Sequence, residues 1–345
     1  MRSVAPYVPG EQPAGDARII KLNTNENPYP PSDRVLAALR TELDERLRLY
    51  PDPDAGALRQ KAATVYGVPI ESILVGNGSD ELLTLLVRAI VDPGAPVAYP
   101  VPTYSLYATL VGLQGARAVE LPFADDWTLP AGLAETGAPL TFLCNPNSPS
   151  GTVVADADIA ALASAVHGVL VVDEAYADFA DHTTLTLLDD HPNLVVLRTL
   201  SKSFSLAGLR VGLAFGHPEL LAGLRTMKDS YNVNRLTLAA ATAALSDVED
   251  MRRNVGRVCA TRERLSDALR ALGYEVPPSR ANFVLARRPG VDQAPIVRAL
   301  AEAGILVRHF PVPRLTDAMR ITIGTDDEID AFLRALRVRI SGQAP

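Results

Sequence analysis

The chain has 345 residues, of which 48% are hydrophobic and 21% are charged, and its formal net charge at pH 7 is −7. This composition can bury a large core, which excludes wholesale disorder, and the length suggests two domains. The lysines and arginines are scattered along the chain, which argues against a nucleic-acid-binding protein with a clustered basic face.

In chain order, the first predicted element is an irregular arm over residues 1–30, rich in Pro, Gly and Asn. Beyond it, short apolar runs alternate with segments of helical periodicity such as 156–166. Most of these runs are continuously apolar, as in strands that are covered on both faces. The pattern predicts an α/β fold with a mainly parallel, seven-stranded sheet flanked by helices, in a large domain over residues 31–240. The strand candidates are 73–75, 96–99, 118–121, 140–144, 169–172, 194–197 and 211–215.

The pattern changes after about residue 240. An apolar stripe with i, i+3 and i+4 spacing runs from Val255 to Leu272 and predicts a helix for which Gly273 is the C-cap. Strands are predicted at 282–286 and 319–323. A helix is predicted between them at 294–303, and another after residue 327. These elements indicate a smaller α/β domain over residues 241–345.

Open parallel sheets bind ligands beyond the carboxyl ends of their strands, and several chemical groups follow predicted strands here. The first strand leads into the segment GNGSDE (76–81) and then into an apolar helix over 82–91. Free N–H groups and the Ser79 hydroxyl at a helix N-terminus would make a phosphate cradle. Taken alone, the motif is better explained by Ser79 or Asp80 capping the helix.

Other groups follow the next strands along the chain. Tyr104 places an aromatic ring at the same edge, where it could instead be a packing residue. The loop 145–151 offers amide and hydroxyl groups, although a plain structural turn accounts for it as well. Asp173 ends a buried strand, so its carboxylate needs a cation, either of the protein or of a ligand.

Lys202 lies between Leu200 and Phe204, just beyond another predicted strand. Most lysines are solvated surface charges, but loss of water would lower the pKa of this one and make it a candidate amine nucleophile. Arg210 follows in the same segment. A phosphate cradle, an aromatic ring, a carboxylate, an amine and an arginine are together the partners that pyridoxal phosphate requires.

These motifs resemble the fold-type I, class II pyridoxal-phosphate aminotransferases, and among them most closely the histidinol-phosphate aminotransferase family. The likeness covers nearly the whole chain, and the segment SKSFSLAGLR (201–210) carries it most specifically. The other motifs that carry it are LNTNENPYP, LYPDPDAGALR, GNGSDE, PTYSLY, NPNSPSG, VVDEAY, ANFVLAR and MRITIGT.

The resemblance implies a role for each matching residue. Lys202 would form the Schiff base with the cofactor and later move the substrate proton. Asp173 would pair with the pyridine nitrogen, Tyr176 would hydrogen-bond the phenolic oxygen, and Tyr104 would stack on the ring. The implied phosphate ligands are Ser79, Asp80, Ser201 and Arg210.

The resemblance also implies a homodimer, because Tyr50 matches a tyrosine that reaches the neighbouring subunit's cofactor phosphate.

The resemblance further implies that Arg320 would bind the anionic end of the substrate, with Arg308 and Tyr7 beside it. In members that take histidinol phosphate this anion is a phosphate. Arginine suits the task because its guanidinium can bond an oxyanion through two N–H groups. Without the resemblance, Arg308 reads as a surface residue and Arg320 as a sheet-edge residue.

One departure from the family pattern falls in the loop NPNSPSG. Family members usually have NPNNPTG, in which an Asn of the central pair donates to the phenolic oxygen of the cofactor. Here Asn147 is followed by Ser148, whose shorter hydroxyl would need a shift or a bridging water to make that contact. We expect Asn147 to be a cofactor ligand, and the effect of Ser148 stays open.

The remaining features are bland. Cys144 and Cys259 have no metal-binding spacing, which argues against a zinc site or a disulfide scaffold and favours the cytoplasm. The five histidines show no metal or catalytic spacing, so no metal is expected. No apolar run approaches the ~18 residues that span a bilayer, and the N-terminus lacks a secretion signal.

The sequence therefore predicts a transaminase that moves an amino group from histidinol phosphate to 2-oxoglutarate, giving imidazole acetol phosphate and glutamate in histidine biosynthesis. The same scaffold could instead serve aromatic amino acids, or a decarboxylase of the phosphothreonine type. A cofactor-holding regulator without activity is a further alternative, against which the intact Lys202, Asp173 and Arg210 argue. Sequence alone cannot decide the amino donor, because donor choice depends on the shape of the pocket.

Overall fold

The computed structural model of the chain describes residues 6–7, 9–12 and 19–341, and its largest feature is a seven-stranded sheet. The strand order is β2-β8-β7-β6-β5-β3-β4. Only β8 runs antiparallel to its neighbours, so the predicted mainly parallel sheet is confirmed. The strands are β2 (Ile73–Asn77), β3 (Pro96–Val101), β4 (Arg117–Pro122), β5 (Leu140–Cys144), β6 (Val169–Asp173), β7 (Leu194–Thr199) and β8 (Val211–Gly216).

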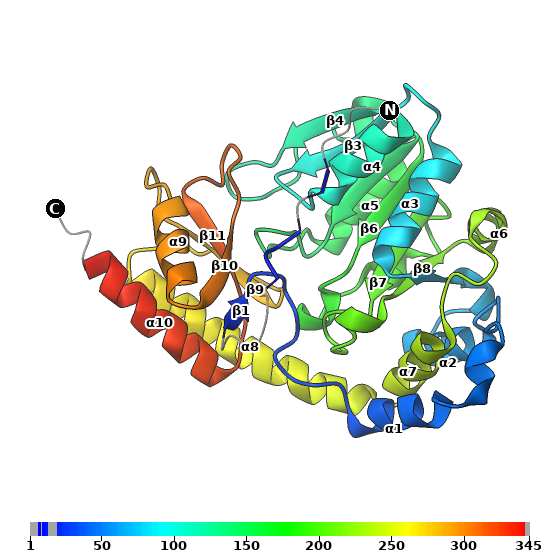
Figure 1. Ribbon diagram of the computed structural model, residues 1–345. Helices are drawn as coiled ribbons and strands as arrows, with labels where there is room; N and C mark the ends of the chain where they lie inside the picture. The colour runs from blue at the N-terminus through cyan, green and yellow to red at the C-terminus, as the bar shows by residue number, and fades with distance from the viewer. Residues whose placement is uncertain (1–5, 8, 13–18, 342–345) are drawn as a thin grey trace.

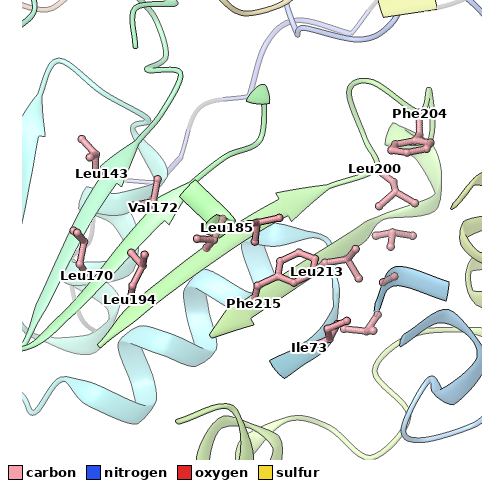
Figure 2. Packing of buried hydrophobic residues seen from close by; sticks show 14 of the residues in the cluster. Ile73, Leu143, Leu170, Val172, Leu185, Leu194, Leu200, Phe204, Leu213 and Phe215 are labelled. Atoms are coloured by element: carbon pink, nitrogen blue, oxygen red, sulfur yellow. The ribbon is translucent and has the colours of Figure 1, made fainter. Parts of the chain in front are cut away.

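Helices cover both faces of this sheet, which explains why most of its strands are nearly continuous apolar runs. Successive side chains of a strand point to opposite faces, so Leu170 and Val172 of β6 pack on one side and Val171 on the other. Figure 2 shows part of the core on the side of the sheet that Leu170 and Val172 face, and Leu213 and Phe215 of β8 belong to the same core. The helices of the first face are α2 (Gly56–Tyr66), α5 (Asp156–Ala165) and α7 (Arg235–Leu245), and those of the second are α3 (Ser79–Ile90), α4 (Leu106–Gln114) and α6 (Pro218–Met227).

A second, four-stranded sheet has the order β1-β10-β11-β9 and its own apolar core (Figure 1). Its first strand comes from the N-terminal arm and runs parallel to β10. The expectation that the whole arm is irregular is therefore wrong for Ile20–Leu22, because this segment has a distant strand to pair with. The elements are β1 (Ile20–Leu22), β9 (Phe283–Arg287), β10 (Ile305–His309), β11 (Ala318–Thr322), α8 (Val248–Ala271), α9 (Ala294–Glu302) and α10 (Asp326–Ser341).

The proposed boundary at residue 240 falls inside α7. Ala240, Ala241 and Leu245 of this helix all belong to the core of the large sheet. Helix α7 packs there against α1 (Asp33–Glu42) and α2. We propose that the large domain extends to the end of α7 and that the small domain begins with α8.

Helix α8 is 24 residues long and carries the predicted apolar stripe. Its C-cap is Leu272, and Gly273 follows with a φ of +83°, the left-handed conformation that glycine adopts most readily after a helix. In Figure 1 the helix runs from beneath the small sheet toward α7 and α1. Within the described residues, no helix is both long and apolar enough to cross a membrane.

Candidate active site

A cavity of about 660 Å³ lies where the two domains and the N-terminal arm meet. The carboxyl ends of β5, β6 and β7 open into it, as expected for a parallel sheet. Most residues that the sequence predicts for the site line this cavity. They are Tyr7, Ser79, Asp80, Tyr104, Asp173, Tyr176, Ser201, Lys202, Arg210, Arg308 and Arg320.

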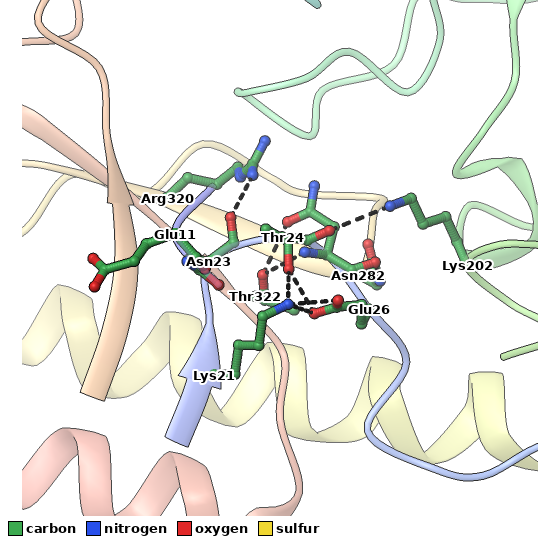
Figure 3. Close-up of polar contacts among 10 residues, drawn as sticks. Glu11, Lys21, Asn23, Thr24, Glu26, Lys202, Asn282, Arg320 and Thr322 are labelled. Carbon is green, nitrogen blue, oxygen red and sulfur yellow. Dashed lines mark hydrogen bonds and ion pairs between the residues drawn. The ribbon is translucent and has the colours of Figure 1, made fainter. Parts of the chain in front are cut away.

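Lys202 reaches the cavity from the loop that follows β7. Its ammonium group donates to the backbone oxygen of Thr24 in the arm at 3.3 Å, as Figure 3 shows, and lies 5.9 Å from the centre of the Tyr176 ring. Burial, together with the positive charge of Arg320, lowers the pKa of Lys202 to about 8. About a tenth of the amine is therefore neutral at pH 7, far more than for a lysine with the usual pKa near 10.4, and the neutral form is the one that attacks an aldehyde.

Asp173 is the last residue of β6 and is 3% exposed. Its Oδ2 accepts a hydrogen bond from the Tyr107 hydroxyl at 2.9 Å, and its Oδ1 accepts one from the backbone N–H of Ala175 at 3.3 Å. Burial raises the pKa of this carboxyl to about 6. Removal from water makes the carboxylate a strong partner for a cationic ring nitrogen. Sequence reasoning missed Tyr107, although it closes the motif PTYSLY.

Two tyrosines shape the space above Asp173. The Tyr176 oxygen accepts a hydrogen bond from the side-chain amide of Asn25 at 3.0 Å, and burial raises the pKa of the phenol to about 12. The Tyr104 ring packs edge-on against Tyr107 and Tyr7 and donates its hydroxyl to Asp80 at 3.2 Å. A flat ring placed between these groups would meet one aromatic face and one phenol.

The segment GNGS forms a tight cradle at the N-terminus of α3. Gly78 adopts a φ of +80°, and a Cβ there would lie 2.6 Å from the Arg210 guanidinium. A Cβ on Gly212 of β8 would lie 2.5 Å from the Ser79 nitrogen, so both positions need glycine for this close approach. Arg210 and Asp80 form an ion pair at 2.9 Å at the mouth of the cradle. Backbone N–H groups at a helix N-terminus beside an arginine suit a phosphate.

Arg320 lies on β11 directly opposite Arg308 of β10. Its guanidinium donates to the Ser148 hydroxyl at 3.1 Å and to the Asn23 backbone oxygen at 3.0 Å, while its buried Nε has no hydrogen-bond partner. Burial lowers the pKa of Arg320, and among the described residues its hydrogen-bond acceptors are neutral oxygens, not carboxylates. A buried guanidinium without an acidic partner beside a second arginine is a site for an anion.

Two sequence predictions fall outside the cavity. The Asn147 amide donates to the backbone oxygen of Pro102, which follows β3, at 3.2 Å and to Ser150 of its own loop at 3.0 Å. Ser148 lines the cavity and Asn147 does not, and a contact of Asn147 with the cofactor stays a prediction. Tyr50 is 78% exposed and stacks on Tyr231 with ring centres 4.4 Å apart. It does not line the cavity of its own chain.

The residues present fit pyridoxal phosphate. The cradle suits the phosphate of this cofactor, and Asp173 suits its cationic ring nitrogen. Tyr176 suits its acidic phenolic oxygen, and Lys202 suits its aldehyde. The buried Nε of Arg320 has no hydrogen-bond partner among the described residues, so it can donate to an anion bound beside these groups. Among the described histidines, cysteines and acidic residues, no group of three or more could hold a metal ion.

The chain is similar to proteins of known name over nearly its full length. It is 46% identical over 338 residues to "Histidinol-phosphate aminotransferase 1" of a Nostoc species, covering 98% of this chain and 96% of that protein. It is 48% identical over 334 residues to the histidinol-phosphate aminotransferase of Geotalea uraniireducens, covering 97% and 96%.

A solved structure and a family model agree with these relatives. The crystal structure of histidinol-phosphate aminotransferase from Sinorhizobium meliloti in complex with pyridoxal-5'-phosphate superposes with a TM-score of 0.87 at 31% identity, covering 94% of this chain and 92% of that one. The family model "Aminotransferase class I and II" matches residues 17–336. The cavity geometry, the relatives and the family model lead to one conclusion: this chain belongs to the class I and II aminotransferases.

Proposed function

We propose that this chain is a pyridoxal-phosphate-dependent aminotransferase that converts histidinol phosphate and 2-oxoglutarate into imidazole acetol phosphate and glutamate. The observation that carries the choice of amino donor is the pair Arg308 and Arg320, which lie opposite each other on neighbouring strands at the cavity. Two guanidinium groups suit a phosphate dianion, whereas the carboxylate of an aromatic amino acid carries a single charge. The names of the relatives support the same substrate.

In this proposal the bound cofactor supplies an electron sink for the charge that develops when the substrate loses a proton. Lys202 would hold the cofactor through its aldehyde and, as a neutral amine, would move the proton at the substrate carbon. Asp173 would keep the ring nitrogen charged, and Tyr176 would donate its hydroxyl to the phenolic oxygen. The GNGS cradle and Arg210 hold the phosphate, so the ring stays in one place while the substrate changes.

We further propose that the enzyme is a cytoplasmic homodimer. Supporting the dimer is an exposed apolar patch, defined by Leu43, Leu47, Leu49, Tyr50 and Tyr231, of which Leu43 is 61% and Tyr50 78% exposed. Large exposed apolar side chains, of which Tyr50 and Tyr231 stack on each other, are typical of an interface, and a second copy of the chain would bring Tyr50 to a neighbouring cavity. Supporting the cytoplasm are the free thiols Cys144 and Cys259, which suit a reducing compartment.

The test of function is a steady-state comparison of amino donors with the purified protein and 2-oxoglutarate. We expect glutamate formation to be faster with histidinol phosphate than with phenylalanine by at least about tenfold in kcat/KM, and to vanish in Lys202→Ala. Arg308→Gln should raise KM for histidinol phosphate about tenfold, since a charge-assisted hydrogen bond contributes roughly 1.5–3 kcal/mol. Preference for phenylalanine, or carbon dioxide release without a keto acid, would contradict the proposal.

A further inference from the structure

Asn25 occupies a special position in the segment of the arm that crosses the cavity. It is 1% exposed and adopts a φ of +57°, the left-handed region that Asn tolerates better than most residues. Its backbone oxygen accepts from the Asn282 amide at 2.9 Å, and its backbone N–H donates to Thr322 Oγ1 at 2.9 Å. The residue is thus held by the small domain while its side chain faces Tyr176 of the large domain. Figure 3 shows how the neighbouring arm residues reach Lys202 on one side and Arg320 on the other.

The hydrogen bonds around Asn25 decide which way its amide is turned. Thr322 Oγ1 accepts a hydrogen bond from the Asn25 backbone N–H, and the Thr322 hydroxyl donates its own proton to Asn25 Oδ1, with the two oxygens 3.0 Å apart. No other acceptor among the described residues takes that proton. A hydroxyl has one proton to donate, so Oδ1 faces Thr322 and the Nδ2 donor faces the Tyr176 oxygen at 3.0 Å.

The amide in turn decides which way the Tyr176 hydroxyl is turned. Because Nδ2 can only donate, the Tyr176 oxygen accepts there and its own proton is left free to point into the cavity. The other charged or titratable groups near this phenol are Lys202, Arg320, Asp173, Cys144 and Tyr104. A donor fixed in this way before a ligand arrives loses little entropy when it binds an oxyanion.

We infer that Asn25 is a positioning residue that, through Thr322, fixes the Tyr176 hydroxyl as a donor toward the phenolic oxygen of the cofactor. The inference rests on the proposed function only in that the cavity holds pyridoxal phosphate. It assigns to the N-terminal arm and to β11 a role that acts through Tyr176. The substrate-binding strand and the cofactor-binding tyrosine are thereby joined through one amide.

The test uses two substitutions at residue 25 that keep the left-handed backbone accessible. Asn25→Asp keeps the shape of the side chain but replaces the Nδ2 donor by an acceptor, so the Tyr176 proton turns away from the cavity. Asn25→Gly removes the amide altogether. The readouts are the Kd for pyridoxal phosphate and the pH midpoint of the visible absorbance of the bound cofactor, with the melting temperature of each cofactor-free protein as a check on folding.

We expect Asn25→Asp to raise the Kd about tenfold and to shift the absorbance midpoint to higher pH, and Asn25→Gly and Thr322→Val to have smaller effects in the same direction. In a Tyr176→Phe background all of these effects should fall to within about twofold, because the group on which Asn25 acts is gone. An unchanged Kd and midpoint in Asn25→Asp, or equal effects in both backgrounds, would overturn the inference. If Asn25→Asp does not fold, the same comparison is made with Thr322→Val.

These readouts need no amino donor, so they separate the inference from the proposed function. In one outcome the wild-type protein binds the cofactor, and the variants show the expected coupling between residues 25 and 176, while histidinol phosphate is not turned over. That result would overturn the proposed substrate and leave the role of Asn25 standing. Turnover of histidinol phosphate by the wild-type protein, with no coupling between residues 25 and 176 among the variants, would overturn the role of Asn25 and leave the proposed substrate standing.

Discussion

At the scale of single residues, burial displaces two protonation equilibria in opposite senses. It lowers the pKa of Lys202 to about 8 and raises that of Asp173 to about 6. In both cases the charged form is the one that loses water, which is the general rule for buried ionisable groups. Near neutral pH the site therefore holds an amine that is ready to react beside a carboxylate that is ready to be paired with a cation.

The amine can be tested by the rate at which it captures the cofactor. We expect the rate of absorbance change on mixing cofactor-free protein with pyridoxal phosphate to rise with pH around about 8, rather than around the usual value for lysine near 10.4. Arg320→Gln should move this midpoint upward, because it removes a positive charge that lowers the pKa of Lys202. A midpoint above 10 in the wild type would show that Lys202 is solvated.

Asp173 predicts a conflict between stability and function. Its folded-state pKa lies above its unfolded value, so its contribution to stability is present at low pH and is lost as pH rises from about 4 to about 6. Asp173→Asn should therefore stabilise the cofactor-free protein at pH 8 by up to about 3 kcal/mol in urea unfolding, and by little at pH 4. The same variant should bind pyridoxal phosphate less tightly. A variant that is less stable than wild type at pH 8 would contradict this account.

At the scale of elements, the phosphate cradle depends on how closely β8 approaches the N-terminus of α3. The contact is between backbone atoms, since a Cβ on Gly212 would lie 2.5 Å from the Gly78 carbonyl carbon and the Ser79 nitrogen. Backbone atoms cannot move aside as a flexible side chain can. The cradle is therefore a joint product of a strand and a loop that are more than a hundred residues apart in the chain.

Gly212→Ala should push the cradle away from β8 and raise the Kd for pyridoxal phosphate more than about tenfold, a loss of roughly 1.4 kcal/mol. Gly216→Ala is the matched control on the same strand, because its Cβ would meet its nearest neighbour, the Leu194 oxygen, at 3.3 Å and needs only a small adjustment. We expect its Kd to stay within about threefold of wild type. Equal effects of the two substitutions in equilibrium titrations would argue against a steric cause.

At the scale of the whole molecule, the cavity is assembled from parts that no single domain provides. Asn23 of the arm accepts a hydrogen bond from Arg320 of the small domain, and Thr24 accepts one from Lys202 of the large domain. The arm thus lies between the two domains as a shared wall. In the proposed dimer, the partner's Tyr50 would complete the phosphate end of each cavity, which its own chain leaves without that tyrosine.

Mixed dimers test this sharing of sites directly. When inactive Lys202→Ala and impaired Tyr50→Ala proteins are unfolded together and refolded, half of the dimers should be hybrids, and each hybrid should contain one site with both wild-type residues. We expect about a quarter of the wild-type activity to return. Recovery no greater than the sum of the separately refolded variants would contradict a site shared between subunits.

Much of this fold is predictable from local sequence. Most strands of the large sheet are nearly continuous apolar runs because helices cover both faces, and that environment leaves a direct trace in residue type; the edge strand β4, which is largely exposed, is the exception. The positions of Lys202, Asp173 and the GNGS segment were also predictable, because each lies at or just beyond the carboxyl end of such a strand. Burial and chain order alone place these groups at one edge of one sheet.

Other features depended on contacts between distant segments. Residues 20–22 form a strand only because β10 lies beside them, and the Asn147 amide finds its partners in Pro102, 45 residues away, and Ser150. The orientation of Asn25 likewise follows from Thr322, nearly three hundred residues away. Local sequence determines which chemical groups reach the ends of the strands, because propensity and burial act over a few residues. Only the tertiary structure decides which of those groups face one another, because hydrogen-bond direction depends on partners that the chain order does not reveal.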